Sequence, residues 1–287
     1  MSAEPNNAFL PNSDSTLNAA LIERYSLSEL VVARINDAER RLGVCFSDAA
    51  VFLGIMKQED VDAIRAVGNR LVVVHRERVK PDDSLVLVRD PFDPHSERVR
   101  SLRTELLLRR DASGGADVIV VMSPCAGEGR SQLAAELAIA FAQLGQPTLL
   151  VDADLRHPRQ HLLFGADNKQ GLSDAIAMDV TPYLHPVEGL PQLSLLTAGP
   201  APQNPLELLC DSRFEKMIDD WRRSFAYVVF DTAPVERYSD ALAVATLVGR
   251  VLAVCRAQHT PYADTRNMLR RLAATQSRIL GAVVNHF

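Results

Sequence analysis

The sequence has few cysteines and lacks the features of a secreted or membrane-spanning chain. Its 287 residues include four cysteines, at positions 45, 125, 210 and 255, with no closely spaced pair. Such spacing argues against a disulfide framework or a zinc site and fits a reducing compartment. No apolar run approaches the roughly 20 residues that span a bilayer. Residues 1–16 have neither the basic start nor the apolar core of a signal peptide. We therefore expect a cytoplasmic protein.

The sequence also lacks a strong excess of positive charge. The formal net charge is −5, and acidic and basic residues are intermixed along the chain. A nucleic-acid partner needs a basic surface, so this composition predicts none.

The chain is long enough for one large α/β domain and a small appendage. Polarity, prolines and apolar spacing divide it into four segments. Residues 1–16 are predicted to be a disordered tail, 17–68 a small helical docking module, 69–93 a linker with a strand-like piece at 71–75, and 94–287 the main domain.

In the main domain, apolar runs of strand length alternate with helical patterns. This alternation predicts βαβ units and a mostly parallel sheet with helices on both faces. The predicted strands are 118–122, 148–151, 193–197, 227–230, 251–254 and 279–284, and the predicted helices are 94–110, 211–223, 240–247 and 262–274.

The sequence VIVVMSPCAGEGRS at 118–131 is the stretch around which the domain is organised. A buried strand, a glycine-containing turn and a helix form the geometry in which backbone N–H groups and the helix N-terminus bind phosphates. The frame G-x-x-x-x-G-K-[ST] falls on 124–131, with Pro124 for the first glycine and Arg130 for the lysine. Arg130 either holds phosphate oxygens with its fork or crowds the γ-phosphate. The alternative interpretation is an ordinary turn without a ligand.

Three aspartates follow predicted strands of the same sheet. Asp152 and Asp154 come after one strand and Asp231 after another. Ligands bind at this edge of open α/β sheets, and carboxylates are suited to Mg²⁺. Each aspartate alone is better explained as the cap of a turn, but their combination with the glycine loop predicts a Mg-nucleotide site.

The main domain resembles the cytoplasmic domain of bacterial tyrosine autokinases of exopolysaccharide synthesis, of the chain-length-determinant-associated type. These belong to the MinD/ParA-like branch of P-loop ATPases. The motifs that carry the resemblance are 123–131 (Walker A), 151–156 (A′) and 231–234 (Walker B), with further matches at 161–165, 171–174, 198–200 and 204–209. The helical segment before it is similar to one repeat of the N-terminal module of type II secretion ATPases. This similarity predicts protein docking there, with cyclic-dinucleotide binding as the alternative.

The resemblance implies roles for individual residues, with ATP and Mg²⁺ as cofactors. The implied catalytic residues are Asp152 as base, Asp154 and Arg130. The implied nucleotide-binding residues are Gly127, Glu128, Gly129, Arg130, Ser131 and Gln132. Ser131, Asp154 and Asp231 are the implied metal ligands, and Glu97, Arg100 and Arg103 the implied subunit contacts of a homo-oligomer.

The resemblance further implies ATP-dependent tyrosine phosphorylation that regulates exopolysaccharide polymerisation, chain length and export. The implied partner is a membrane chain-length determinant protein, which would hold the chain at the inner membrane. The C-terminal tyrosine cluster of such kinases is missing, because the chain ends in VVNHF. A catalytically degenerate nucleotide-binding scaffold therefore stays open. So does a positioning ATPase, although Cys125 stands where those proteins carry a signature lysine.

Overall fold

A computed structural model describes residues 27–42, 46–57, 78–110 and 115–286. The chain divides into two compact units, Met1–Val73 and Val74–Phe287. The predicted tail at 1–16 and the strand-like piece at 71–75 lie outside the described residues, so the predicted segment boundaries stay predictions. Within the described residues, no helix has the length and apolar character needed to cross a membrane.

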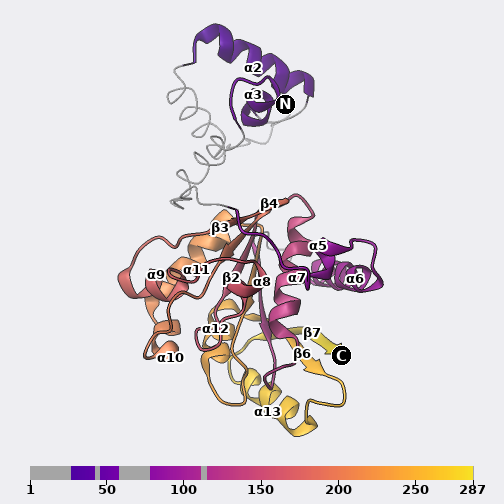
Figure 1. Cartoon of the computed structure of the whole chain (residues 1–287). Coiled ribbons are helices and arrows are strands. Elements are labelled where there is room, and N and C mark those ends of the chain that lie inside the picture. The colour runs from indigo at the N-terminus through magenta and orange to yellow at the C-terminus, as the bar shows by residue number, and fades with distance from the viewer. Residues whose placement is uncertain (1–26, 43–45, 58–77, 111–114, 287) are drawn as a thin grey trace, which may run out of the picture. The chain divides into compact units, whose positions relative to one another are not determined.

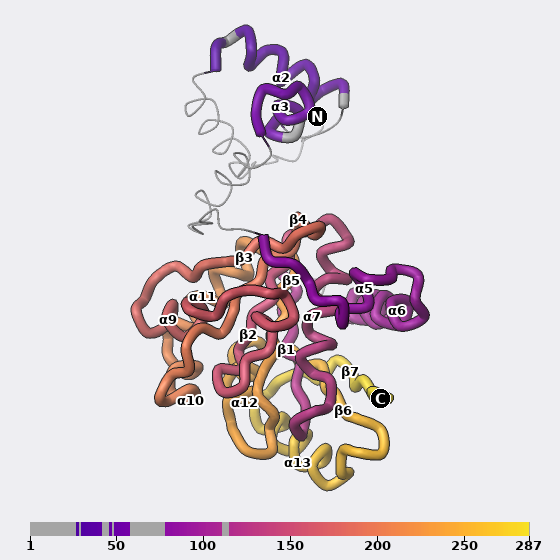
Figure 2. The backbone as a smooth tube through the Cα atoms, in the orientation of Figure 1, coloured from indigo at the N-terminus to yellow at the C-terminus, as the bar shows by residue number. Residues whose placement is uncertain are grey.

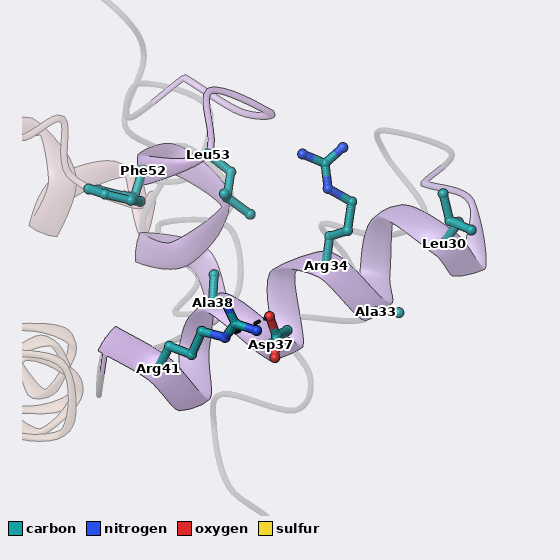
Figure 3. Close-up of a pocket in the computed structure, with 8 residues that line it drawn as sticks. All are labelled: Leu30, Ala33, Arg34, Asp37, Ala38, Arg41, Phe52 and Leu53. Carbon is teal, nitrogen blue, oxygen red and sulfur yellow. Dashed lines mark ion pairs between the residues drawn. The ribbon is translucent and has the colours of Figure 1, made fainter.

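The described residues of the first unit form two helices, α2 (Glu29–Leu42) and α3 (Phe46–Phe52). Residues at helical spacing on both pack together around Ile35, Phe46 and Ala49, which are at most 3% exposed. A hollow of about 550 Å³ lies beside them, and Leu30, Arg34, Arg41 and Phe52 are among its lining residues. Figure 3 shows these side chains.

The second unit is built on a seven-stranded sheet with the order β3-β4-β2-β5-β1-β6-β7 (Figures 1 and 2). All neighbouring strands are parallel except β3 and β4, which confirms the predicted α/β fold. The strands are β1 (Asp117–Met122), β2 (Thr148–Asp152), β3 (His185–Val187), β4 (Leu190–Leu196), β5 (Tyr227–Asp231), β6 (Arg250–Arg256) and β7 (Arg278–Asn285).

Helices of several lengths surround this sheet. They are α5 (Val86–Arg89), α6 (Pro94–Leu108), α7 (Arg130–Ala142), α8 (Gln160–Leu163), α9 (Leu172–Met178), α10 (Pro205–Leu209), α11 (Ser212–Ser224), α12 (Asp240–Val248) and α13 (Tyr262–Ala273). The sequence predicted the longer ones, α6, α11, α12 and α13, and the helix that follows the glycine turn, α7. It did not predict the short α5, α8, α9 and α10 or the strand β3, because a pattern of three to seven residues is too short for a period to emerge.

Successive side chains along each strand point to opposite faces of the sheet. Ile119 and Val121 of β1 join the large core around α7, where Phe141 stacks on Tyr227 with ring centroids 4.3 Å apart. All residues of α7 except Ser131 and Gln132 are buried, because α5 and α6 cover the side of α7 that faces away from the sheet. The helix that follows the glycine turn is therefore fixed from all directions.

Aromatic side chains join α11 to the other face of the sheet. Phe214 and Trp221 of α11 are at most 1% exposed, and the Phe214 ring lies 6.2 Å from that of Phe230 on β5. Edge-to-face pairs at this distance add to the free energy of burial. Phe230 directly precedes Asp231, so this cluster also supports the end of the strand that carries the acidic residue.

We predict that Phe214→Ala lowers the free energy of unfolding by about 3–5 kcal/mol, because it leaves a cavity between α11 and β5. Urea unfolding followed by the fluorescence of Trp221, the single tryptophan of the chain, measures this loss. Phe92→Ala is the control, since Phe92 is 90% exposed and its truncation leaves no cavity. Equal midpoints for the two variants would contradict the packing described here.

Candidate functional site

The predicted phosphate loop lies between β1 and α7, at the carboxyl edge of the sheet. Gly127 and Gly129 have φ angles of +75° and +86°, which side-chain-bearing residues rarely adopt. They turn the chain back so that α7 begins at Arg130 with its N-terminal N–H groups toward the loop. The strand, turn and helix predicted from the sequence are all present, and this geometry binds anions.

A cavity of about 380 Å³ lies in front of this loop. Residues 126–132 form one side, and Asp154, His157, Arg159, Leu163 and Pro234 complete the lining. Of the residues predicted to bind nucleotide, all six line this cavity. Their roles stay predictions, but their common position fits a bound phosphate chain.

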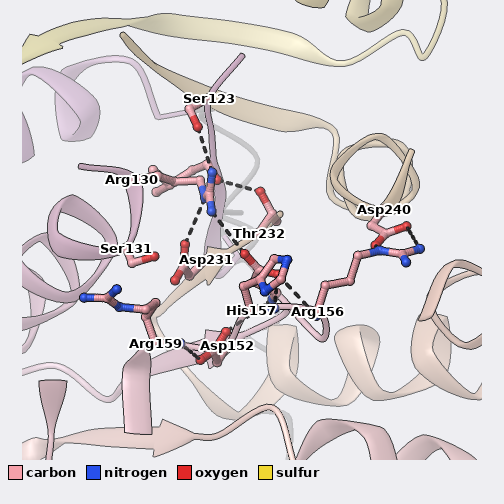
Figure 4. A network of polar contacts seen from close by, with 12 residues as sticks. Ser123, Arg130, Ser131, Asp152, Arg156, His157, Arg159, Asp231, Thr232 and Asp240 are labelled. Carbon is pink, nitrogen blue, oxygen red and sulfur yellow. Dashed lines mark hydrogen bonds and ion pairs between the residues drawn. The ribbon is translucent and has the colours of Figure 1, made fainter. Parts of the chain in front are cut away.

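Arg130 lies among the acidic and hydroxyl side chains of the site, as Figure 4 shows. Its side chain is 9% exposed, and its guanidinium donates to Ser123 Oγ at 2.7 Å, Asp154 Oδ2 at 3.1 Å and Asp231 Oδ1 at 3.3 Å. A planar fork with several donors suits this triple contact, whereas an ammonium group has a different geometry. One cation thus bridges two residues that were predicted to hold a metal.

Asp231 is fully buried at the end of β5 and needs these partners. Gln160 Nε2 donates to Asp231 Oδ2 at 2.8 Å and to the Ser131 carbonyl at 2.9 Å, so it ties the strand end to α7. Burial raises the pKa of Asp231, and the charge of Arg130 and the hydrogen bond from Gln160 oppose that rise. Gln160 is absent from the sequence-predicted site residues, because it directly precedes the family-matched segment 161–165 and no local pattern marks it.

Asp152 is also fully buried, but its carboxylate bonds to the backbone rather than to another side chain. Its Oδ2 accepts the backbone N–H groups of Arg159 and Gln160 at 3.0 and 2.9 Å, and its Oδ1 accepts that of Asp154 at 3.2 Å. Burial and then the charge of Asp231 raise the pKa of Asp152 well above its usual value. Asp152 anchors the loop after β2 and does not line the cavity. Its role as catalytic base stays a prediction.

Two predicted nucleotide-binding residues use their side chains to hold the loop. Glu128 is 1% exposed, and its carboxylate accepts the Cys125 N–H at 3.1 Å and the Thr260 hydroxyl. Gln132 Nε2 donates to the Ser84 carbonyl at 2.7 Å. In this arrangement both side chains are engaged within the chain.

The predicted subunit-contact residues of α6 do not share one environment. Arg100 pairs with Glu97 on the helix surface, and their side chains are 23% and 66% exposed. Arg103 instead donates to the Ala140 carbonyl of α7 at 2.8 Å. Arg103 therefore joins α6 to α7 within the chain, and a contact with another subunit stays a prediction for all three.

The oxygen atoms at the site fit a magnesium ion. Among the described residues, no group of three or more His, Cys, Asp or Glu side chains is placed to hold a metal alone. Mg²⁺ commonly takes one or two carboxylates and completes its shell with waters and substrate phosphates. Asp154 and Asp231 already converge on a cation, and Ser131 lies beside them, so these residues suit that ion once Arg130 moves.

The order of the strands, the glycine loop and the acidic residues at the strand ends together define a P-loop NTPase fold. No protein-family profile matches the chain. Named relatives do. CapB of Staphylococcus aureus, named as a tyrosine-protein kinase, is 31% identical over 197 residues, which cover 68% of this chain and 86% of CapB. The tyrosine-protein kinase YwqD of Bacillus subtilis is 30% identical over 204 residues, 70% of this chain and 85% of YwqD. The chain belongs to the bacterial tyrosine-protein kinase family.

The relatives differ in how much of their length is matched. EpsB of Ralstonia nicotianae is 36% identical over 203 residues, yet the match covers only 27% of that protein. Among solved structures, the kinase domain of Escherichia coli tyrosine kinase ETK has a TM-score of 0.68 at 29% identity and covers 74% of this chain and 82% of that one. The chimerical protein CapA2B2 has a TM-score of 0.66 at 31% identity and covers 80% and 98%. The cell division ATPase MinD of Pyrococcus furiosus has a TM-score of 0.52 at 21% identity, and the match covers 59% of this chain and 72% of that one. This likeness shows the fold alone.

We predict that Arg130→Met lowers the free energy of unfolding by about 3–5 kcal/mol, because it leaves two buried carboxylates without their counter-charge. Millimolar Mg²⁺ should recover part of this loss without nucleotide, since the ion binds the freed carboxylates of the folded state. Thermal melting with and without Mg²⁺ measures both effects.

Arg156→Met is the matched control, because Arg156 pairs with a single buried carboxylate, that of Asp240. It should lose stability without gaining a response to Mg²⁺. A melting temperature of Arg130→Met that is equal to wild type, or that does not respond to Mg²⁺, would contradict a bridging role for Arg130.

Proposed function

We propose that this protein is a Mg-ATP-dependent tyrosine kinase that regulates exopolysaccharide polymerisation, chain length and export. The observation that carries the proposal is the cavity itself. Backbone N–H groups of the glycine loop and two carboxylates from neighbouring strands line or adjoin one space of about 380 Å³. Phosphoryl transfer is mainly a matter of positioning and charge stabilisation, and these are the groups that provide both.

Each group has a defined part in the proposed reaction. The amides at 127–131 would bind the phosphates, and Asp154 and Asp231 would hold Mg²⁺, which would neutralise charge on the phosphate. The tyrosine oxygen bonds to the γ-phosphorus as the bond to the leaving ADP breaks. Asp152 is the proposed acceptor of the phenol proton; because its carboxylate is buried and bonded to backbone N–H groups, this role requires that the loop after β2 release it toward the substrate.

We place this activity at the inner membrane through a partner. The proposed partner is a membrane chain-length determinant protein, and the similarity to the chimerical protein CapA2B2 supports pairing of this kind. Glu97 and Arg100, on the surface of α6, are the proposed contacts between copies of the chain.

A nucleotide-binding scaffold without phosphoryl transfer is the second candidate. Arg130 favours it, because a guanidinium held by Ser123, Asp154 and Asp231 occupies the side of the site where Mg²⁺ is proposed to bind. In that case nucleotide would change assembly or docking rather than modify a tyrosine.

For nucleotide binding, we predict micromolar affinity for ATP with Mg²⁺ in a calorimetric titration. Asp231→Asn should weaken it by about tenfold or more, because a metal-binding carboxylate is lost. Asp219→Asn, which makes the same change on the exposed part of α11, should bind as wild type does. If the wild-type protein shows no detectable ATP binding, both the kinase and the scaffold proposals are wrong for the isolated chain.

For phosphoryl transfer, we predict phosphate on Tyr262 after incubation with ATP and Mg²⁺. Tyr262 is 79% exposed, whereas Tyr227 is 6% exposed and stacked on Phe141. Tyr262 also lies between Thr260 and Asp264, which contact Glu128 and Cys125 of the loop. Mass spectrometry locates the phosphate, with Tyr262→Phe as control. ATP binding without phosphate on any tyrosine, including those of an added partner, would favour the scaffold.

A further inference from the structure

The cavity at the glycine loop contains two arginines in different electrostatic situations. The guanidinium of Arg130 is surrounded by acceptors and shares its charge with Asp154 and Asp231. With both carboxylates ionised, these three side chains together are negative. A phosphate chain that enters the cavity therefore gains little attraction from Arg130 in this arrangement, because opposite charges at contact distance cancel its field.

Arg159 is the other arginine. It directly precedes α8, and its backbone N–H is fixed by Asp152 Oδ2 at 3.0 Å. Within the part of the chain that the structure describes, the Arg159 side chain makes no hydrogen bond or ion pair, and it lines the same cavity as the glycine loop. In Figure 4 its side chain passes below Ser131 and points away from Arg130 and Asp231. The backbone is thus anchored while the guanidinium stays available.

We propose that Arg159 is a phosphate-binding residue that supplies the positive charge which Arg130 does not offer while it pairs with Asp154 and Asp231. This inference rests on the proposed nucleotide site. The loop that carries Arg159 also carries Asp154, and the terminal phosphate of a nucleoside triphosphate lies nearest the metal-binding carboxylates. Arg159 therefore binds the terminal phosphate, and the planar guanidinium of Arg159 matches the spacing of two oxygens of that phosphate.

Such a division of tasks follows from the chemistry of the two positions. A buried guanidinium is stable only where carboxylates balance it, so Arg130 is committed to Asp154 and Asp231 in the described arrangement. Arg159 is exposed at the cavity, where binding a phosphate requires no existing bond to break. The site thereby keeps a cation for the phosphates without a lysine in its glycine loop.

Calorimetric titration of the full chain with ATP and with ADP, each with Mg²⁺, tests the inference. Arg159→Ala should weaken ATP binding by about 10- to 100-fold, the range for losing a charge-assisted contact, and ADP binding clearly less. Arg159→Lys, which keeps the charge but not the fork, should fall between wild type and alanine. Arg223→Ala is the control, since that side chain is 68% exposed on α11 and pairs with Asp220.

The outcomes separate the two proposals. Wild-type affinity of Arg159→Ala for ATP, or an equal loss for ATP and ADP, overturns the role of Arg159 and leaves the nucleotide site standing. Wild-type protein that binds neither nucleotide overturns the proposed function and this inference together. Thermal melting of Arg159→Ala should match wild type, because the substitution keeps the backbone N–H that Asp152 accepts.

Discussion

The ion pairs of Arg130 with Asp154 and Asp231 are the contacts on which the arrangement of the site depends. Parallel pairing of β2, β5 and β1 brings the ends of these strands to one edge of the sheet, where Asp152 and Asp231 lie at the same register. Carboxylates placed so close in a buried edge repel one another and are costly to ionise. The Arg130 guanidinium, bonded to Asp231 and Asp154, offsets part of this repulsion and joins α7 to the ends of β2 and β5.

This arrangement gives the site two states that compete for the same carboxylates. In one, Arg130 is their counter-ion; in the other, a divalent cation would take that place. A ligand shifts such an equilibrium only by its difference in affinity for the two states. The site is therefore suited to a nucleotide that brings its own metal. If Mg²⁺ binds as proposed, the same competition would slow turnover, which is the physical basis of the scaffold proposal.

The loop itself is held from several sides before any ligand arrives. Glu128 is bonded to Thr260, at the loop that precedes α13, and its carbonyl accepts Asn285 Nδ2 at 2.8 Å at the end of β7. Gln132 bonds to the segment before α5. Preorganised N–H groups bind an anion without first being ordered, which favours both binding and electrostatic catalysis. The last strand of the sheet is thus connected directly to the phosphate loop.

The sequence by itself determined the strand, glycine turn and helix at 118–131, the alternation that makes a parallel sheet, and the edge on which the aspartates lie. These depend on local spacing, which the order of residues records directly. Only the tertiary structure decided that Arg130 bonds to residues 24 and 101 positions away, that Gln160 joins Asp231 to Ser131, and that Asp152 holds a loop rather than facing the cavity. It also decided that Arg103 contacts Ala140 and that Arg159 keeps a guanidinium without a partner among the described residues. The direction of a polar side chain depends on which strands become neighbours and in what register, and no local pattern carries that information.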